Sequence, residues 1–202
     1  NGPALAALAR RAGAAPALQA CVPDSLAALN AALDRALAEV ELVIFSGGSS
    51  VGAYDLVAPV LAARGAEFFF DAVRMRPGRP VLFARVAGRL CFGLPGNPLG
   101  AMLSFAMCAR PAIELLAGVA LEAVPPACVT ARLGFDYRGP RLNLTAFHPA
   151  RLRARGLDTE VEAIPYHSSA DLAAAAAANG FWLVPEGVTE LAAGSAVQVL
   201  LK

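Results

Sequence analysis

Apolar runs alternate with amphipathic stretches along the first part of the chain. Residues 41–45 form a continuous apolar run, the pattern of a strand buried on both faces of a sheet. Leucines at helical spacing after Asp24 and Ser25 predict an amphipathic helix with a polar cap. The alternation predicts an α/β layer with a mainly parallel sheet. The expected helices are residues 2–12, 26–37, 55–63 and 99–116, and the expected strands are residues 41–45, 67–73, 81–86 and 89–93.

The pattern changes near Val124. Short strand-like stretches separated by glycine and proline follow it, with one short alanine-rich helix at residues 171–178. Many short strands with such turns are typical of a small β-barrel-like domain. We therefore divide the chain into an α/β domain, residues 1–122, and a barrel domain, residues 123–202. The strands expected in the second domain are residues 128–133, 141–147, 160–164, 181–184 and 196–201.

Composition narrows the possible partners and the compartment. A length of 202 residues suits one large or two small domains, and a net charge of +1 gives no support for a nucleic-acid or membrane-surface partner. No apolar stretch approaches the ~20 residues of a membrane span, and no signal peptide is found. The cysteines fit neither a zinc site nor a disulfide framework, which predicts small buried hydrophobic residues in a reducing cytoplasm. The chain opens in a helix without an initiator Met, so we expect a fragment of a longer protein.

The sequence SGGSSVG, residues 46–52, follows the apolar run and precedes a predicted helix. Ligands of open α/β sheets bind beyond the carboxyl ends of strands, where glycines let backbone N–H groups approach an anion. The alternative is a tight glycine turn without a ligand. Asp55, three residues past Gly52, could hold Mg²⁺ or simply face the positive end of the helix dipole. Asp24 is similarly a cation ligand or a helix cap.

Two further loops carry features of anion sites. In RMRPGRP, residues 74–80, Arg76 and Arg79 belong to a rigid Pro-Gly turn and could present guanidinium groups to a phosphate or another oxyanion. In LPGNP, residues 94–98, Asn97 could bind a ligand or cap the helix that Pro98 begins. A solvated basic turn and simple helix capping are the respective alternatives. Together, these loops and the two acids suit a phosphorylated or anionic ligand with a divalent cation.

Other catalytic patterns are not found in the sequence. His148 and His167 stand alone without metal-ligand spacing, and we take them as surface or structural residues. There is no GxSxG nucleophile elbow and no legible pairing of cysteine with histidine.

The three loops occur in an order that resembles a known family. SGGSSVGAYD, RPGRP and GLPGNP resemble the third domain of the molybdopterin molybdenumtransferases, the bacterial MoeA family that also includes the E domain of gephyrin. Residues 168–201, with an Ala-Asn-Gly step and a Pro-Glu-Gly turn, resemble the family's terminal barrel. The resemblance covers this chain but only the back half of a family protein, so we expect two preceding domains and the first strand of this domain to be missing. It implies a three-layer molybdopterin-binding α/β domain with a mainly parallel sheet, followed by a small β-barrel-like domain.

The resemblance also implies an activity and a set of site residues. Members of the family bind adenylylated molybdopterin and molybdate, and with Mg²⁺ they cleave the phosphoanhydride, release AMP and place molybdenum on the dithiolene. By correspondence, Asp55 and Asp24 would be the catalytic and metal-binding acids. A cytoplasmic homodimer that shares each active site between chains is implied as well. The implied substrate-binding residues are Ser46, Gly47, Gly48, Ser50, Gly52, Arg76, Pro77, Gly78, Arg79, Pro80, Gly96, Asn97 and Pro98.

Departures from the family pattern leave alternatives open. The upstream loop reads Asp24-Ser25 where two acids are common, and Ala146 and Ser168 stand where the family has an arginine and a glycine. These differences motivate a non-catalytic molybdopterin-binding scaffold as the alternative to an enzyme fragment with an incomplete active site. A third hypothesis is the sister molybdopterin adenylyltransferase, whose loop usually reads TGGTG. The SVG sequence, the RPGRP turn and the appended barrel favour the molybdenumtransferase.

Overall fold

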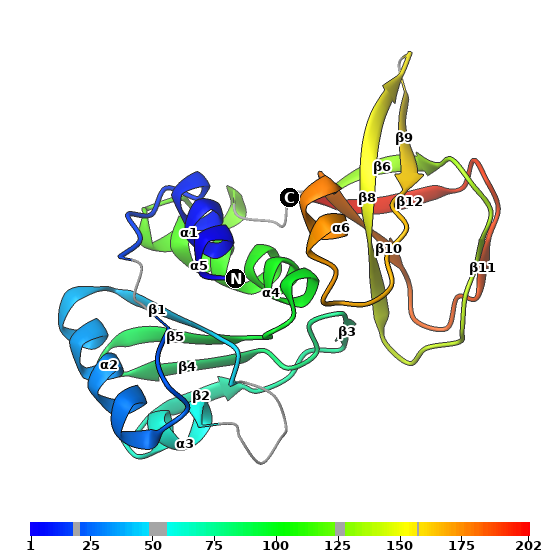
Figure 1. The fold of residues 1–202 in the computed structure, drawn as a ribbon. Coiled ribbons are helices and arrows are strands. Elements are labelled where there is room, and N and C mark those ends of the chain that lie inside the picture. Colours follow the sequence, from blue (N-terminus) through cyan, green and yellow to red (C-terminus); the bar gives the residue numbers. More distant parts are fainter. Residues whose placement is uncertain (18–20, 49–55, 124–127, 157) are drawn as a thin grey trace.

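The computed structural model describes residues 1–17, 21–48, 56–123, 128–156 and 158–202. Within them the chain forms a four-stranded sheet with helices on both faces, and a second sheet that closes into a barrel (Figure 1). The predicted α/β layer followed by a barrel-like unit is confirmed.

The first sheet is mixed, which corrects the expectation of a mainly parallel sheet. Its strands lie in the order β1 (Leu42–Ser46), β5 (Arg89–Leu94), β4 (Leu82–Val86) and β2 (Glu67–Phe70). Only β1 and β5 pair in parallel among these described strands, while β4 is antiparallel to both β5 and β2. The reason is local: Ala87 and Gly88 both have positive φ, as a two-residue hairpin turn requires, so β4 and β5 must run in opposite directions.

Helices cover both faces of this sheet and make three layers (Figure 1). On one face, α2 (Leu26–Glu39) and α3 (Val57–Ala62) pack against apolar side chains of β4 and β5, with Leu33 and Leu61 fully buried. On the other face lie α1 (Gly2–Arg11) and a long helical run comprising α4 (Pro98–Ser104), a π-helical turn (Phe105–Ala109) and α5 (Arg110–Leu116). The π-helical turn comes just before Pro111, whose nitrogen cannot donate to a carbonyl one turn earlier.

Two expectations from composition need correction. Cys91 is buried and Cys108 is half-buried, but Cys21 and Cys128 are exposed. Cys21 lies in an irregular segment, and Cys128 is the first residue of the strand Cys128–Leu133. The run Pro98–Leu116 is, by length and composition, long and apolar enough to cross a membrane. It is 56% buried within the fold, as a core helix is, so length and composition alone do not make it a membrane span.

The second sheet closes on itself as a five-stranded barrel. The strands follow the order β10 (Gly180–Val184), β12 (Ala196–Leu201), β6 (Cys128–Leu133), β9 (Asp158–Ala163) and β8 (Thr145–Arg155), and β8 pairs back with β10. The strand expected at residues 141–147 is instead the long β8, which serves both β10 and β9 along its length. A two-residue pair of β7 (Tyr137–Arg138) and β11 (Glu190–Leu191) was not anticipated. Trp182 and Val199 are buried inside the barrel.

The two sheets are interlocked through one hydrophobic core. The short strand β3 (Met75–Arg76) comes from the first part of the chain but pairs in parallel with β8 of the barrel. The helix α6 (Leu172–Ala177) packs against α4, and Ala175, Phe181 and Leu200 share a buried cluster with the helices of the first sheet. The domain division between residues 122 and 123 stays a prediction.

The tight packing of α6 on α4 can be tested with two neighbouring alanines. Ala175 is fully buried in the shared core, whereas Ala176 is exposed on the same helix. We expect Ala175→Leu to lower the free energy of unfolding by about 1–3 kcal/mol, because a larger side chain must displace well-packed neighbours. Ala176→Leu should change it by less than about 0.5 kcal/mol. Urea denaturation of both variants measures the difference, and equal stabilities would contradict the packing described.

Candidate functional site

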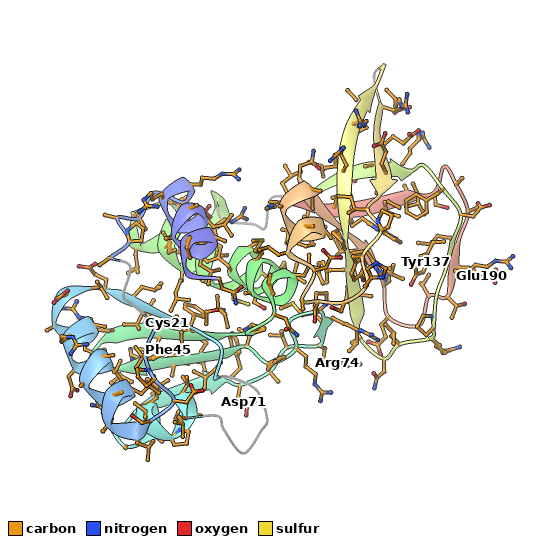
Figure 2. The ribbon with its side chains drawn as sticks, in the orientation of Figure 1. Cys21, Phe45, Asp71, Arg74, Tyr137 and Glu190 are labelled. Atoms are coloured by element: carbon orange, nitrogen blue, oxygen red, sulfur yellow. The ribbon has the colours of Figure 1, made fainter. Side chains whose placement is uncertain are left out.

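The described parts of the three predicted loops lie at one edge of the first sheet. The strands β1 and β5 run in parallel, so Ser46 at the end of β1 and Pro95 after β5 leave the sheet at the same edge. Two successive antiparallel pairings give β2 the same direction, which places Asp71, directly after β2, at that edge too (Figure 2). The RPGRP turn precedes β4 and enters the sheet from the same side. This is the edge at which open α/β sheets bind ligands.

The glycine loop after β1 lies against the loop after β5. A Cβ atom on Gly96 would lie 3.6 Å from the Cα of Gly47, so the two backbones approach closely. The Gly47 N–H donates to the Leu94 carbonyl (3.0 Å). Gly47 and Gly48 both have positive φ, which glycine adopts without strain. The remaining predicted residues of this loop, Ser50, Gly52 and Asp55, lie outside the described residues.

Asn1 joins these two loops and was missed by sequence reasoning. Its side-chain amide donates to the Ser46 hydroxyl (2.8 Å) and to the Gly96 carbonyl (2.7 Å). An asparagine before the Gly-Pro start of a helix suggests only a helix cap, yet its side chain makes no capping hydrogen bond to α1. The contacts depend on α1 packing over the ends of β1 and β5, which adjacent residues cannot reveal.

The RPGRP turn is held against α4 through Gly78. This glycine is buried with φ of +98°, and a Cβ there would lie 2.6 Å from the Ser104 hydroxyl and 2.9 Å from the end of the Met75 side chain. The Ser104 hydroxyl donates to the Gly78 carbonyl at 3.5 Å, and the Arg79 carbonyl accepts from Val81 (3.0 Å). Pro77 and Pro80, on either side of this core, are half-buried. The turn is therefore a fixed loop, as its two prolines suggested.

The arginines of this segment divide into two kinds. Arg74 donates to the Asn143 carbonyl (2.6 Å) and to Glu186 (2.7 Å), both in barrel loops. Figure 2 shows Arg74 at the junction between the first sheet and the barrel. Arg76 and Arg79 are exposed, and in the described part of the chain neither pairs with a carboxylate. Two guanidinium groups free of carboxylate partners on a rigid turn can bind an oxyanion through charge-assisted hydrogen bonds.

Asn97 occupies the N-cap position of α4, and its role in ligand binding stays a prediction. It makes no side-chain capping bond; instead its amide donates to the Ser169 hydroxyl of the barrel (2.9 Å). The Ser169 carbonyl also accepts the Leu99 N–H (3.0 Å), which occupies one of the free donors in the first turn of α4. Pro98 does begin the helix, as expected. Ser169 is thus a second residue that the sequence did not reveal, because it lies about seventy residues away along the chain.

The predicted metal ligands are only partly described. Asp24 is exposed, and the cap of α2 is Ser25, whose hydroxyl accepts the Ala28 N–H (3.2 Å), so Asp24 is not the cap. Within the described ranges, no group of three or more His, Cys, Asp and Glu side chains is placed to hold a metal ion. Asp71 adds an exposed carboxylate at the ligand edge that sequence reasoning overlooked, although its place directly after a strand was a usable signal.

An aromatic cluster of the barrel, which contains His148, Tyr166 and Trp182, lies next to the arginine turn. His148 is half-buried; its Nδ1 is 2.9 Å from the Tyr166 hydroxyl, and its ring stacks on Trp182 (centroids 5.0 Å apart). Burial, and secondarily the positive charge of Arg76, lowers the pKa of His148 to about 4. Its imidazole is therefore neutral near pH 7. The other histidine, His167, is exposed.

Two family models match successive parts of the chain. The family described as a probable molybdopterin binding domain matches residues 1–115, and the MoeA C-terminal region (domain IV) matches residues 130–202. A molybdopterin molybdenumtransferase of Nostoc sp. is 34% identical over 203 residues, which cover 99% of this chain and 46% of that protein. Molybdopterin molybdenumtransferase 2 of Mycobacterium tuberculosis is 35% identical, and the matched residues cover 98% of this chain and 49% of that protein. The chain spans about half the length of the curated relatives it matches.

Solved structures show the same fold. A molybdopterin biosynthesis MoeA protein from Pyrococcus horikoshii superposes with a TM-score of 0.79 at 24% identity, over 100% of this chain and 47% of that one. A molybdenum cofactor biosynthesis protein from Pyrococcus furiosus superposes with a TM-score of 0.74 at 25% identity, over 100% of this chain and 64% of that one.

The contact between Gly78 and α4 generates a test of how the turn is held. We expect Gly78→Ala to lower the free energy of unfolding by about 2–4 kcal/mol. Two costs add up: the backbone strain of a Cβ atom at positive φ, and the overlap of that atom with Ser104. Gly88→Ala is the matched control, since Gly88 also has positive φ but has no atom within 4 Å of its added Cβ. That variant should cost only about 1 kcal/mol. Thermal or urea unfolding compares them, and a Gly78 variant as stable as the control would rule out the close contact.

Proposed function

Because the chain belongs to the family of probable molybdopterin binding domains and continues into a MoeA C-terminal region, we propose that the complete protein is a molybdopterin molybdenumtransferase. The activity would transfer molybdate to adenylylated molybdopterin with release of AMP. The observation that supports it most directly is the gathering of a glycine loop, a helix-opening loop and an arginine turn at one sheet edge. Arg76 and Arg79 meet no carboxylate among the described residues there.

Cleavage of the phosphoanhydride requires that the protein neutralise negative charge; a protein nucleophile is less important. Cleavage of a phosphoanhydride develops negative charge on the leaving phosphate, and preorganised donors and cations stabilise that charge. In this proposal the backbone of Gly47 and Gly48 approaches the phosphate groups, while Arg76 and Arg79 bind oxyanions of the substrates. The close contacts of Gly78 fix the backbone from which the side chains of Arg76 and Arg79 project.

The proposal includes a magnesium ion only because the family resemblance implies one. When bound, Mg²⁺ would neutralise phosphate oxygens, with oxygen ligands from Asp24 and Asp55. Asp24 is exposed, so its carboxylate is open to solvent. A cytoplasmic location is a prediction on the same footing.

The function is tested in the complete protein with adenylylated molybdopterin, Mg²⁺ and molybdate. We expect molybdate-dependent release of AMP from the unmodified protein. We expect Arg79→Ala to weaken substrate affinity about ten- to hundredfold, because the variant loses a hydrogen bond to a charged group. Its unfolding free energy should change by less than about 0.5 kcal/mol, because Arg79 is exposed. Arg155→Ala, an exposed arginine on the distal barrel hairpin, is the matched control and should behave as the unmodified protein.

Three results would redirect the proposal. Tight molybdopterin binding without AMP release, with Asp55→Asn unchanged, would favour the non-catalytic scaffold. ATP-dependent adenylylation of molybdopterin would favour the adenylyltransferase. Equal affinities in Arg79→Ala and Arg155→Ala would remove the arginine turn from the site.

We also propose that the complete protein is a homodimer, as the resemblance implies. An apolar groove of about 600 Å³ between the β2–β4–β5 sheet and the α5 side of the long helical run gives a surface for it. Leu116 of α5 lines this groove, and Phe69 of β2 contacts Phe83, another lining residue. Leu116 is 52% exposed and Phe69 is 48% exposed. Exposed apolar surface of this kind marks contact sites more often than free surface.

The dimer is tested by sedimentation of two matched variants. We expect Leu116→Glu, which puts a charge at the groove, to shift the complete protein toward monomer. Leu172→Glu on α6 is the control, since Leu172 is 57% exposed against 52% for Leu116 but lies outside the groove. A protein that sediments as a monomer before any change, or two variants with equal dimer fractions, would contradict the proposal.

A further inference from the structure

The barrel residue His148 lies beside the arginine turn because two strands pair there. In the parallel pair of β3 and β8, Arg76 lies opposite Ala146. His148 is two residues farther along β8, so its side chain projects from the same face as that of Ala146. Arg76 and His148 are therefore diagonal neighbours on one face, a separation that a long side chain can span.

His148 packs among three uncharged aromatic side chains of the barrel: Trp182, Tyr137 and Tyr166. Trp182 lies opposite it in β10 and stacks on its ring, while Tyr137 of β7 packs at 5.6 Å between ring centroids. Nδ1 is paired with the Tyr166 hydroxyl, whereas Nε2 is buried with no hydrogen-bond partner in the described part of the chain. A proton on this ring would have no carboxylate to neutralise it, so the free protein disfavours the imidazolium.

Arg76 is the charged group that acts on this cluster. The titratable groups that face His148 are Tyr137 and Tyr166, and burial raises the pKa of both hydroxyls, while the charge of Arg76 opposes that rise. For His148, burial and Arg76 act in the same direction and lower its pKa. Whatever neutralises Arg76 therefore changes the environment of the imidazole.

We propose that an anion bound at the RPGRP turn and a proton on His148 favour each other, so that His148 is a proton-linked residue of the anion site. This inference rests on the proposed function only in taking the turn as an anion site. His148 would act through Arg76, without touching the anion itself. The anion offsets the positive charge of Arg76, and the imidazolium then no longer faces an uncompensated like charge.

The sign of the linkage follows directly. With the anion bound, the pKa of His148 rises from its value of about 4 toward the ordinary value for histidine. Between these two values, anion binding takes up protons. By reciprocity, the affinity for the anion increases as the pH falls from neutral through that window. Without His148, this part of the pH dependence disappears.

Sulfate is the probe for the test, because it is a tetrahedral dianion whose charge stays constant between pH 4 and pH 8. The imidazole signal of His148 in the complete protein, assigned with His148→Gln, is followed by NMR against pH with and without saturating sulfate. We expect sulfate to raise the pKa of His148 by about one unit, which corresponds to a tenfold gain in sulfate affinity when the ring is protonated. In Arg76→Gln the pKa of His148 should be higher at the outset and insensitive to sulfate.

The second histidine provides the matched control. His167 is exposed and lies outside the cluster, so its titration should not respond to sulfate in the same sample. Proton uptake on sulfate binding at pH 5, measured by calorimetry in two buffers, should be lost in His148→Gln and kept in His167→Gln. An unchanged pKa of His148, a rise that persists in Arg76→Gln, or no sulfate binding would overturn the inference. Because sulfate binding needs no turnover, an absence of AMP release would refute the proposed enzyme and leave this result standing.

Discussion

The close approach of the RPGRP turn to α4 is the constraint on which the junction depends. Any side chain at Gly78 would overlap the hydroxyl of Ser104, the one fully buried polar side chain among the described residues. The turn is thus fixed on the helix, and Met75 and Arg76, with which the turn begins, are placed to form β3 against β8. Since β8 is also a strand of the closed barrel, one backbone contact joins the ligand edge of the sheet to the barrel.

The barrel completes the first turn of α4 as well as packing against it. The hydroxyl of Ser169 accepts from the Asn97 amide, and its carbonyl accepts from the Leu99 N–H. A barrel residue therefore caps the N-terminal end of α4. The charges at the junction divide accordingly: Arg74 joins the turn to the barrel through Glu186, whereas Arg76 and Arg79 stay exposed. The barrel is therefore a structural support of the loops at the sheet edge, and through His148 it also faces their charge.

Local patterns were sufficient wherever neighbours in the chain determine the structure. Residues 41–45 predicted β1, and residues 81–86 and 89–93 predicted β4 and β5, because the apolar pattern of a buried strand is a local property. The expected mainly parallel sheet was wrong, because the two-residue turn at Ala87 and Gly88 forces β4 and β5 into an antiparallel pair. The alternation of strands and helices along the chain favours parallel strands and does not record such a turn. The candidate loops were likewise found from their glycines and arginines, while Asp55 lies outside the described residues, so its place beside Asp24 stays a prediction.

The sequence by itself determined which segments are strands, helices and glycine turns, and it indicated which loops carry chemistry that suits an anion. Only the tertiary structure decided which distant groups meet. Asn1 with Gly96, Asn97 with Ser169, and Arg76 with the His148 cluster are each joined by packing of elements far apart in the chain. Hydrogen bonds and charge interactions depend on distances in space, and a linear pattern records only distances along the backbone. For that reason the sequence indicates the parts of a candidate site, and the fold determines which of them lie close together.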